Sequence, residues 1–182
     1  MEPVQEKSFI NISVITGAVI AVVSSITIYG LALMSISSGS PGVAGLVIGC
    51  FLCCGFVILP GLLSSRLYIY DIQKSIEVGK GALIGAVSGL AFGVVFGFMD
   101  VIWKLFDVDT ASLMVEYYIM VMQNLDMPEL NDAIDQMRDA QEQASSGIGS
   151  ILMNIVIVSV INVVSGLSGT AIFSKKFEKN EF

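Results

Sequence analysis

An uninterrupted run without charge covers the first third of the chain, from Ser8 to Ser65. As a single α-helix at about 1.5 Å per residue, this run would be roughly 87 Å long, nearly three times the ~30 Å hydrocarbon core of a bilayer. The run must therefore fold back on itself, and residues 37–42, Ser-Ser-Gly-Ser-Pro-Gly, have the composition of a turn. We predict two membrane-spanning helices on either side of it, over about 9–36 and 43–65.

Two further uncharged runs predict two more spans. They cover residues 81–99 and 144–174 and indicate helices over about 80–103 and 148–173. Because no water is available inside a bilayer, each backbone polar group needs an internal partner, which favours helices. Only 14% of the residues are charged, against roughly 25% in soluble domains. We therefore predict an all-α membrane protein with four transmembrane helices in one domain, residues 1–182, and exclude soluble enzymes, nucleic-acid binders and disordered chains.

The basic residues predict the orientation of this bundle. Cytoplasmic loops of membrane proteins carry an excess of Lys and Arg. Seven of the nine basic residues lie before the first span, between the second and third, or after the fourth: Lys7, Arg66, Lys74, Lys80, Lys175, Lys176 and Lys179. The other two, Lys104 and Arg138, lie between the third and fourth spans. Both termini are therefore predicted to lie in the cytoplasm.

Glycines recur at every fourth residue through the third predicted span: Gly81, Gly85, Gly89, Gly93 and Gly97. Such a row, a glycine zipper, leaves no Cβ between neighbouring backbones, and close contact of this kind holds membrane helices together. The packing partner is either another helix of the same chain or a second copy of the protein, and the pattern allows both.

The fourth predicted span carries polar and small residues on one face, at spacings of three or four: Ser159, Asn162, Gly166 and Gly169. Asn154 lies about 80° around the helix from Asn162, and we expect it to line the same interface. An amide in hydrocarbon needs a partner, so this face is interpreted as polar packing between helices, with a pathway for a solute as the alternative. In the second span, Pro60 predicts a kink because proline removes a helical hydrogen bond.

The residues that carry most enzyme chemistry are scarce. The chain contains no His, the usual catalytic base and metal ligand near neutral pH. Cys50, Cys53 and Cys54 lie within the second span and are interpreted as small packing residues. Asp100 lies near the outer end of the third span, with Lys104 one turn later as its expected ion-pair partner. We predict no catalytic residue, cofactor site or metal site, and we do not expect an enzyme.

An acidic segment, residues 105–146, separates the last two spans and is predicted to form an extracytoplasmic helical hairpin. Its first helix covers about 110–124, with Asp109 or Thr110 as N-cap. The second begins at residues 126–129, Asp-Met-Pro-Glu, and continues to about residue 143. One face of this second helix is acidic: Glu129, Asp132, Asp135, Asp139 and Glu142. We interpret this acidic face as a solvated surface, with docking of a basic partner or loose binding of a divalent ion as alternatives.

Two sequence elements frame the second half of the chain. Residues 80–85, Lys-Gly-Ala-Leu-Ile-Gly, open the third span, and residues 166–176, Gly-Leu-Ser-Gly-Thr-Ala-Ile-Phe-Ser-Lys-Lys, close the fourth. With the acidic, Met-rich segment between them, they resemble a bacterial family of four-helix membrane proteins of unassigned function, over most of the chain. The resemblance implies a four-span bundle in the bacterial inner membrane and brings no catalytic residues to this sequence.

These patterns favour a non-catalytic membrane protein that acts by association, as an accessory subunit or as an assembly or structural factor of a membrane complex. Its expected partners are the lipid bilayer and another membrane protein or further copies of itself. No nucleic acid and no cofactor are expected. The alternative is a small transporter or channel component that works as an oligomer, using the polar face of the fourth span and the kink in the second.

Overall fold

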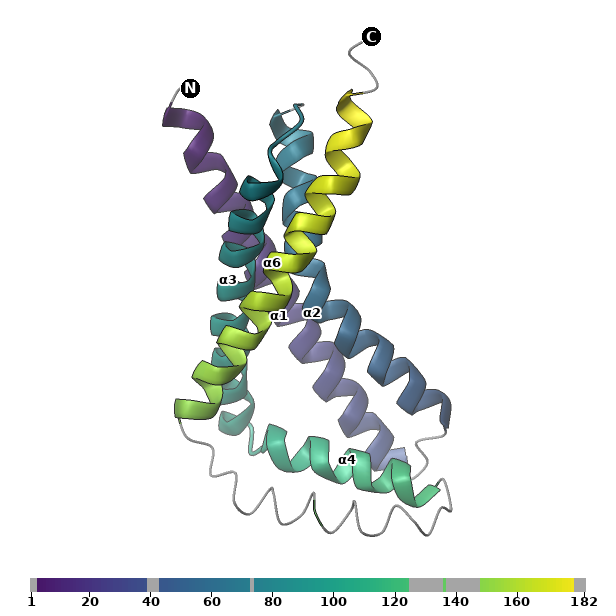
Figure 1. Ribbon diagram of the computed structural model, residues 1–182. Coiled ribbons are helices and arrows are strands. Elements are labelled where there is room, and N and C mark those ends of the chain that lie inside the picture. The colour runs from purple at the N-terminus through teal and green to yellow at the C-terminus, as the bar shows by residue number, and fades with distance from the viewer. Residues whose placement is uncertain (1–2, 39–42, 73, 125–135, 137–147, 179–182) are drawn as a thin grey trace.

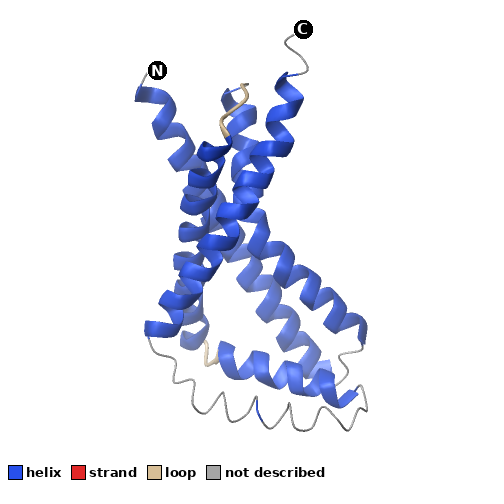
Figure 2. Ribbon diagram, viewed as in Figure 1, coloured by secondary structure: helices blue, strands red, loops and turns tan. Residues whose placement is uncertain are grey.

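A computed structural model describes residues 3–38, 43–72, 74–124, 136 and 148–178 of the chain. The described residues form helices joined by short loops, and they contain no strand (Figure 2). The helices are α1 (Pro3–Ser38), α2 (Val43–Ile72), α3 (Val78–Leu105), α4 (Thr110–Asn124) and α6 (Ile148–Glu178). The fold is therefore all-α in the part of the chain that the structure describes.

Three of these helices are long and apolar enough to cross a membrane. The candidate spans are Phe9–Ser38 in α1, Val78–Leu105 in α3 and Leu152–Lys175 in α6. The chain thus has the character of a multi-pass membrane protein. The fourth expected span, residues 43–65, lies within α2, which is not among the three; side chains of residues 43–53 lie outside the described part.

The helices extend beyond the spans expected from the uncharged runs. α1 already begins at Pro3, and α6 continues to Glu178. Charged residues such as Glu and Lys are good helix formers, and proline is tolerated in a first helical turn. The limits of an uncharged run therefore mark the part of a helix that can lie in the hydrocarbon core of a bilayer. The helix itself ends where its backbone hydrogen bonds end.

The long helices cross near their middles and separate toward one end (Figure 1). α3 packs along α6, α1 contacts α3 and α2, and α2 contacts α6. The start of α1 and the end of α6 lie at the same end of the bundle. At the opposite end α1 and α2 diverge from α3 and α6, and α4 lies across the gap between the ribbons (Figure 1).

The turn from α3 into α4 is built by local hydrogen bonds. The amides of Phe106 and Val108 both donate to the Trp103 carbonyl, at 3.0 and 3.1 Å. Asp107 has φ 57°, a left-handed conformation that aspartate tolerates better than most residues. Asp109 then precedes α4, and its carbonyl accepts the Leu113 amide at 2.9 Å. The first helix of the expected hairpin is present with the expected bounds, while the second, apart from residue 136, lies outside the described residues.

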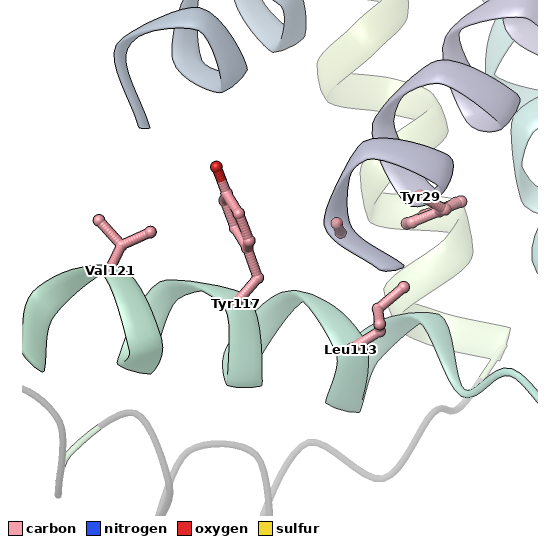
Figure 3. Close-up of a cluster of buried hydrophobic side chains, with 5 residues drawn as sticks. Tyr29, Leu113, Tyr117 and Val121 are labelled. Carbon is pink, nitrogen blue, oxygen red and sulfur yellow. The ribbon is translucent and has the colours of Figure 1, made fainter. Parts of the chain in front are cut away.

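An apolar cluster joins α4 to α1. Leu113, Tyr117 and Val121 are buried and project from the same side of α4 (Figure 3). They pack with Tyr29 and Ala32 of α1, and Trp103 and Phe96 of α3 lie against the same cluster. The apolar side of α4 is thus covered by protein at the end of the bundle.

Small polar side chains lie in the interior beside the apolar clusters, and large apolar side chains lie on the outer surface. The fully buried side chains include several small polar ones: Ser13, Ser24, Ser25, Ser64, Ser65, Ser88, Asn162 and Thr170. Large apolar side chains instead face outward, among them Ile15, Val19, Met34, Val94, Phe98 and Val160. Small interior residues permit close helix packing, and an apolar exterior suits contact with lipid.

Candidate functional site

Four glycines of α3 lie directly against α6 of the same chain. A Cβ built on Gly89 would lie 2.8 Å from both the Asn162 Cβ and the Ser159 Cα, and one on Gly93 would lie 3.0 Å from the Ile155 Cα. At Gly81 the added atom would meet the Thr170 hydroxyl, and at Gly85 the Asn162 carbonyl oxygen. A side chain at any of these positions would require the two backbones to separate. Gly97 is half-buried.

Two glycines of α6 face two different helices. A Cβ on Gly166 would lie 2.9 Å from the Cα of Gly85 on α3. One on Gly169 would lie 3.2 Å from the Ser65 Cβ and 3.3 Å from the Leu62 Cα on α2. α6 is therefore in close contact with α3 through one glycine and with α2 through the other.

The side chain of Asn162 is fully buried and hydrogen-bonded to the backbone of α2. Its Oδ1 accepts the Gly61 amide at 2.7 Å, and its Nδ2 donates to the Val57 carbonyl at 2.9 Å. The second Nδ2 hydrogen bond goes to the Val158 carbonyl within α6, also at 2.9 Å. Both donors of the amide are thus used inside the protein.

The two α2 groups that bind Asn162 are the two that an α-helix would join to each other. An amide in an α-helix normally donates to the carbonyl four residues earlier, which for Gly61 is Val57. Pro60 lies between them, and its ring interferes with the preceding turn. α2 remains helical and changes direction along its length (Figure 1). The Asn162 carboxamide, a chemical equivalent of a peptide group, therefore binds both of these groups beside Pro60.

Further buried hydroxyls join helices that are distant in sequence. Ser65 on α2 donates to the Gly166 carbonyl on α6 at 3.1 Å. Ser174 on α6 accepts the Ile76 amide at 3.2 Å, which ties α6 to the α2–α3 loop. These residues were not singled out from the sequence, since an isolated Ser in an apolar run gives no signal of the carbonyl it will reach.

Asp100 and its neighbours form a polar group at the other end of the bundle. The Tyr29 hydroxyl donates to Asp100 Oδ1 at 2.9 Å, and the Thr110 side chain also hydrogen-bonds to this carboxyl. Lys104 acts on Asp100 through its charge. The Trp103 indole N–H donates to Ser25 at 2.8 Å. Asp100 therefore links α1, α3 and the first residue of α4.

Other polar residues of the predicted spans lie elsewhere. Asn154 is exposed, so it does not line the interface that buries Asn162. The start of α6 lies beside α3, while α2 diverges from α6 toward that end of the bundle (Figure 1). Cys54 is an exposed free thiol, and the side chains of Cys50 and Cys53 lie outside the described residues. Among the residues described, no three of His, Cys, Asp and Glu are grouped as metal ligands would be.

The five residues of the predicted acidic face all lie outside the described part of the chain: Glu129, Asp132, Asp135, Asp139 and Glu142. Docking of a basic partner on this face stays a prediction.

No protein-family model, curated protein sequence or solved structure matches this chain. The resemblance to bacterial four-helix membrane proteins therefore stays a prediction from the sequence.

Proposed function

We propose that the chain is a non-catalytic membrane protein that acts by association, as an accessory subunit or as an assembly or structural factor of a membrane complex. In this proposal α2 is a fourth span beside α1, α3 and α6. The membrane is the bacterial inner membrane, and both termini lie in the cytoplasm. The glycines at every fourth residue of α3 form a glycine zipper that packs against another helix of the same chain.

The use of the buried polar groups is the observation that supports this proposal. The Asn162 amide and the hydroxyls of Ser65 and Ser174 bind backbone groups of neighbouring segments. A site for a solute needs polar groups that are free to exchange partners, whereas both donors of Asn162 are already occupied. An interior built in this way favours a fixed scaffold, which acts through the surfaces that it presents.

The acidic face of residues 129–142 is the proposed docking surface for a basic partner. We would extract the full-length tagged protein in a mild detergent and identify the proteins that co-purify with it. Replacing the five acidic residues of this face by Lys should remove the partner. The matched control replaces Asp71, in the last turn of α2, and Glu77, just before α3, two exposed acids, and should retain it. Recovery of the wild type only as a partner-free monomer would contradict the proposal.

A small transporter or channel component is the second candidate, and two buried hydroxyls favour it. Within the described residues, Ser64 Oγ and Thr170 Oγ1 are buried without a hydrogen-bond partner. Such groups are costly unless something else satisfies them. Liposomes containing the protein would then pass a small polar solute, and Asn162→Leu would reduce the flux. Absence of flux for a broad panel of solutes would exclude this candidate.

A further inference from the structure

Two lysines lie near the two ends of α3. The exposed large apolar side chains of this helix are Val78, Leu83, Leu90, Val94, Phe98, Val101 and Leu105. The distance along the helix from Lys80 to Lys104 is about 36 Å, slightly more than the ~30 Å of a hydrocarbon core. The two lysines therefore lie at the headgroup level of opposite membrane surfaces.

Lys80 is held by aromatic rings. Its Nζ lies 5.6 Å from the ring centroid of Tyr68 on α2 and 5.9 Å from that of Phe9 on α1. Tyr68 is buried and Lys80 is half-buried. Within the described residues, Lys80 makes no ion pair with a carboxylate. Ring faces attract an ammonium without using its three N–H donors, so the donors remain available for an anionic acceptor.

The other charged groups described at this end favour an anion. Arg66 lies with its guanidinium carbon 5.7 Å from the ring centroid of Phe173, and Lys74 and Lys175 are exposed. The acids whose side chains are described here are Asp71 and Glu77, both exposed. Among the side chains described at this end, basic groups therefore outnumber acidic ones, and basic groups beside a bilayer attract anionic headgroups.

We propose that Lys80 binds the phosphate of an anionic phospholipid at this membrane surface. The rings of Tyr68 and Phe9 place the ammonium at the junction of α1, α2 and α3, where a headgroup beside Leu83 reaches it. Lys104 differs because the Asp100 carboxyl, one turn earlier, already interacts with its charge. This site does not depend on any protein partner, so it stands or fails separately from the proposed function.

Native mass spectrometry of the full-length protein in detergent tests the proposal. The protein is titrated with phosphatidylglycerol and, separately, with zwitterionic phosphatidylcholine. Wild type should bind phosphatidylglycerol more tightly, and Lys80→Gln should weaken this binding by about fivefold, the usual contribution of one basic residue near an anionic surface. Lys104→Gln, which removes the same charge at the other end of the same helix, should leave it unchanged. Lys80→Arg should retain it.

Three results would overturn the proposal. The first is equal binding by wild type and Lys80→Gln, with Lys80→Met as a second variant that keeps the apolar stem if the first does not fold. The second is an equal loss in Lys104→Gln, because binding would then follow net charge alone. The third is displacement of the lipid by inorganic phosphate at equal concentration, because the site would then bind a free anion.

Discussion

At the scale of single residues, Asn162 decides how α2 and α6 fit together. A proline inside a membrane helix removes the hydrogen bond to the carbonyl four residues earlier, here that of Phe56, and its ring disturbs the preceding turn. Asn162 supplies a donor and an acceptor in the spacing of a peptide group and binds Gly61 and Val57 on either side of Pro60. The polar face was predicted from the sequence as packing between helices. The identity of its partner was not, because the two segments are 101 residues apart.

Replacing Asn162 by Leu should lower the free energy of unfolding by about 1–3 kcal/mol, since the hydrogen bonds of Asn162 to the Gly61 amide and the Val57 carbonyl are lost and Leu offers no replacement. Unfolding of the detergent-solubilised protein by SDS would be followed by fluorescence of Trp103, the single tryptophan. Ser168→Ala is the control, because this exposed serine bonds only within α6.

The double variant Asn162→Leu/Pro60→Leu separates the effect of the proline in α2 from general packing. Without Pro60, Gly61 and Val57 can pair with each other, so the second substitution should recover part of the stability lost in the first. Strictly additive effects of the two substitutions would contradict a direct coupling between Asn162 and Pro60.

At the scale of helices, close backbone contact is arranged by glycines on both partners. The regular spacing along α3 predicted one continuous small face, and the structure places Gly81, Gly85, Gly89 and Gly93 against α6. Gly17 of α1, in contrast, was not singled out, although an added Cβ there would lie 3.1 Å from the Ala91 Cβ on α3. A single glycine has no periodicity, so only tertiary structure reveals its neighbour.

The same substitution should have opposite effects at two glycines. Gly85→Ala should destabilise the bundle by about 1–3 kcal/mol, because the new Cβ would lie 2.8 Å from the Asn162 carbonyl carbon on a rigid backbone. Gly30→Ala should stabilise it by about 0.5–1 kcal/mol, because nothing lies within 4 Å of that position and alanine favours a helix. SDS unfolding curves of the two variants provide the measurement, and equal shifts in one direction would contradict the contact between α3 and α6.

At the scale of the whole molecule, the apolar outer surface agrees with the membrane protein that the composition predicted. Low charge and long apolar runs predicted helices in a membrane, and the three candidate spans agree with this prediction. The positions of α4 across one end and of its partners Tyr29 and Ala32 were not predictable. Many apolar residues in each span are equivalent by composition, and nothing local distinguishes the few that α4 covers.

Cysteine labelling should place the two ends of the bundle on opposite sides of the membrane. In a variant without Cys50, Cys53 and Cys54, an impermeant maleimide should label Phe106→Cys from outside intact cells. It should label Ser75→Cys only after lysis, because the α2–α3 loop lies at the end of the bundle that carries most of the basic residues. Both native residues are exposed.

The reverse labelling pattern would overturn the predicted orientation, and labelling of both positions from one side would overturn the number of membrane crossings between them. Asp132→Cys, within the acidic face, should be labelled together with Phe106→Cys.

The bond between Asn162 and α2 also has a consequence for biosynthesis. Gly61 is translated 101 residues before Asn162, and at about 5–20 residues per second this is a delay of roughly 5–20 s. Throughout that interval the side chain that will bind Gly61 and Val57 does not yet exist. The pairing of α2 with α6 can therefore form only after α6 has been synthesised.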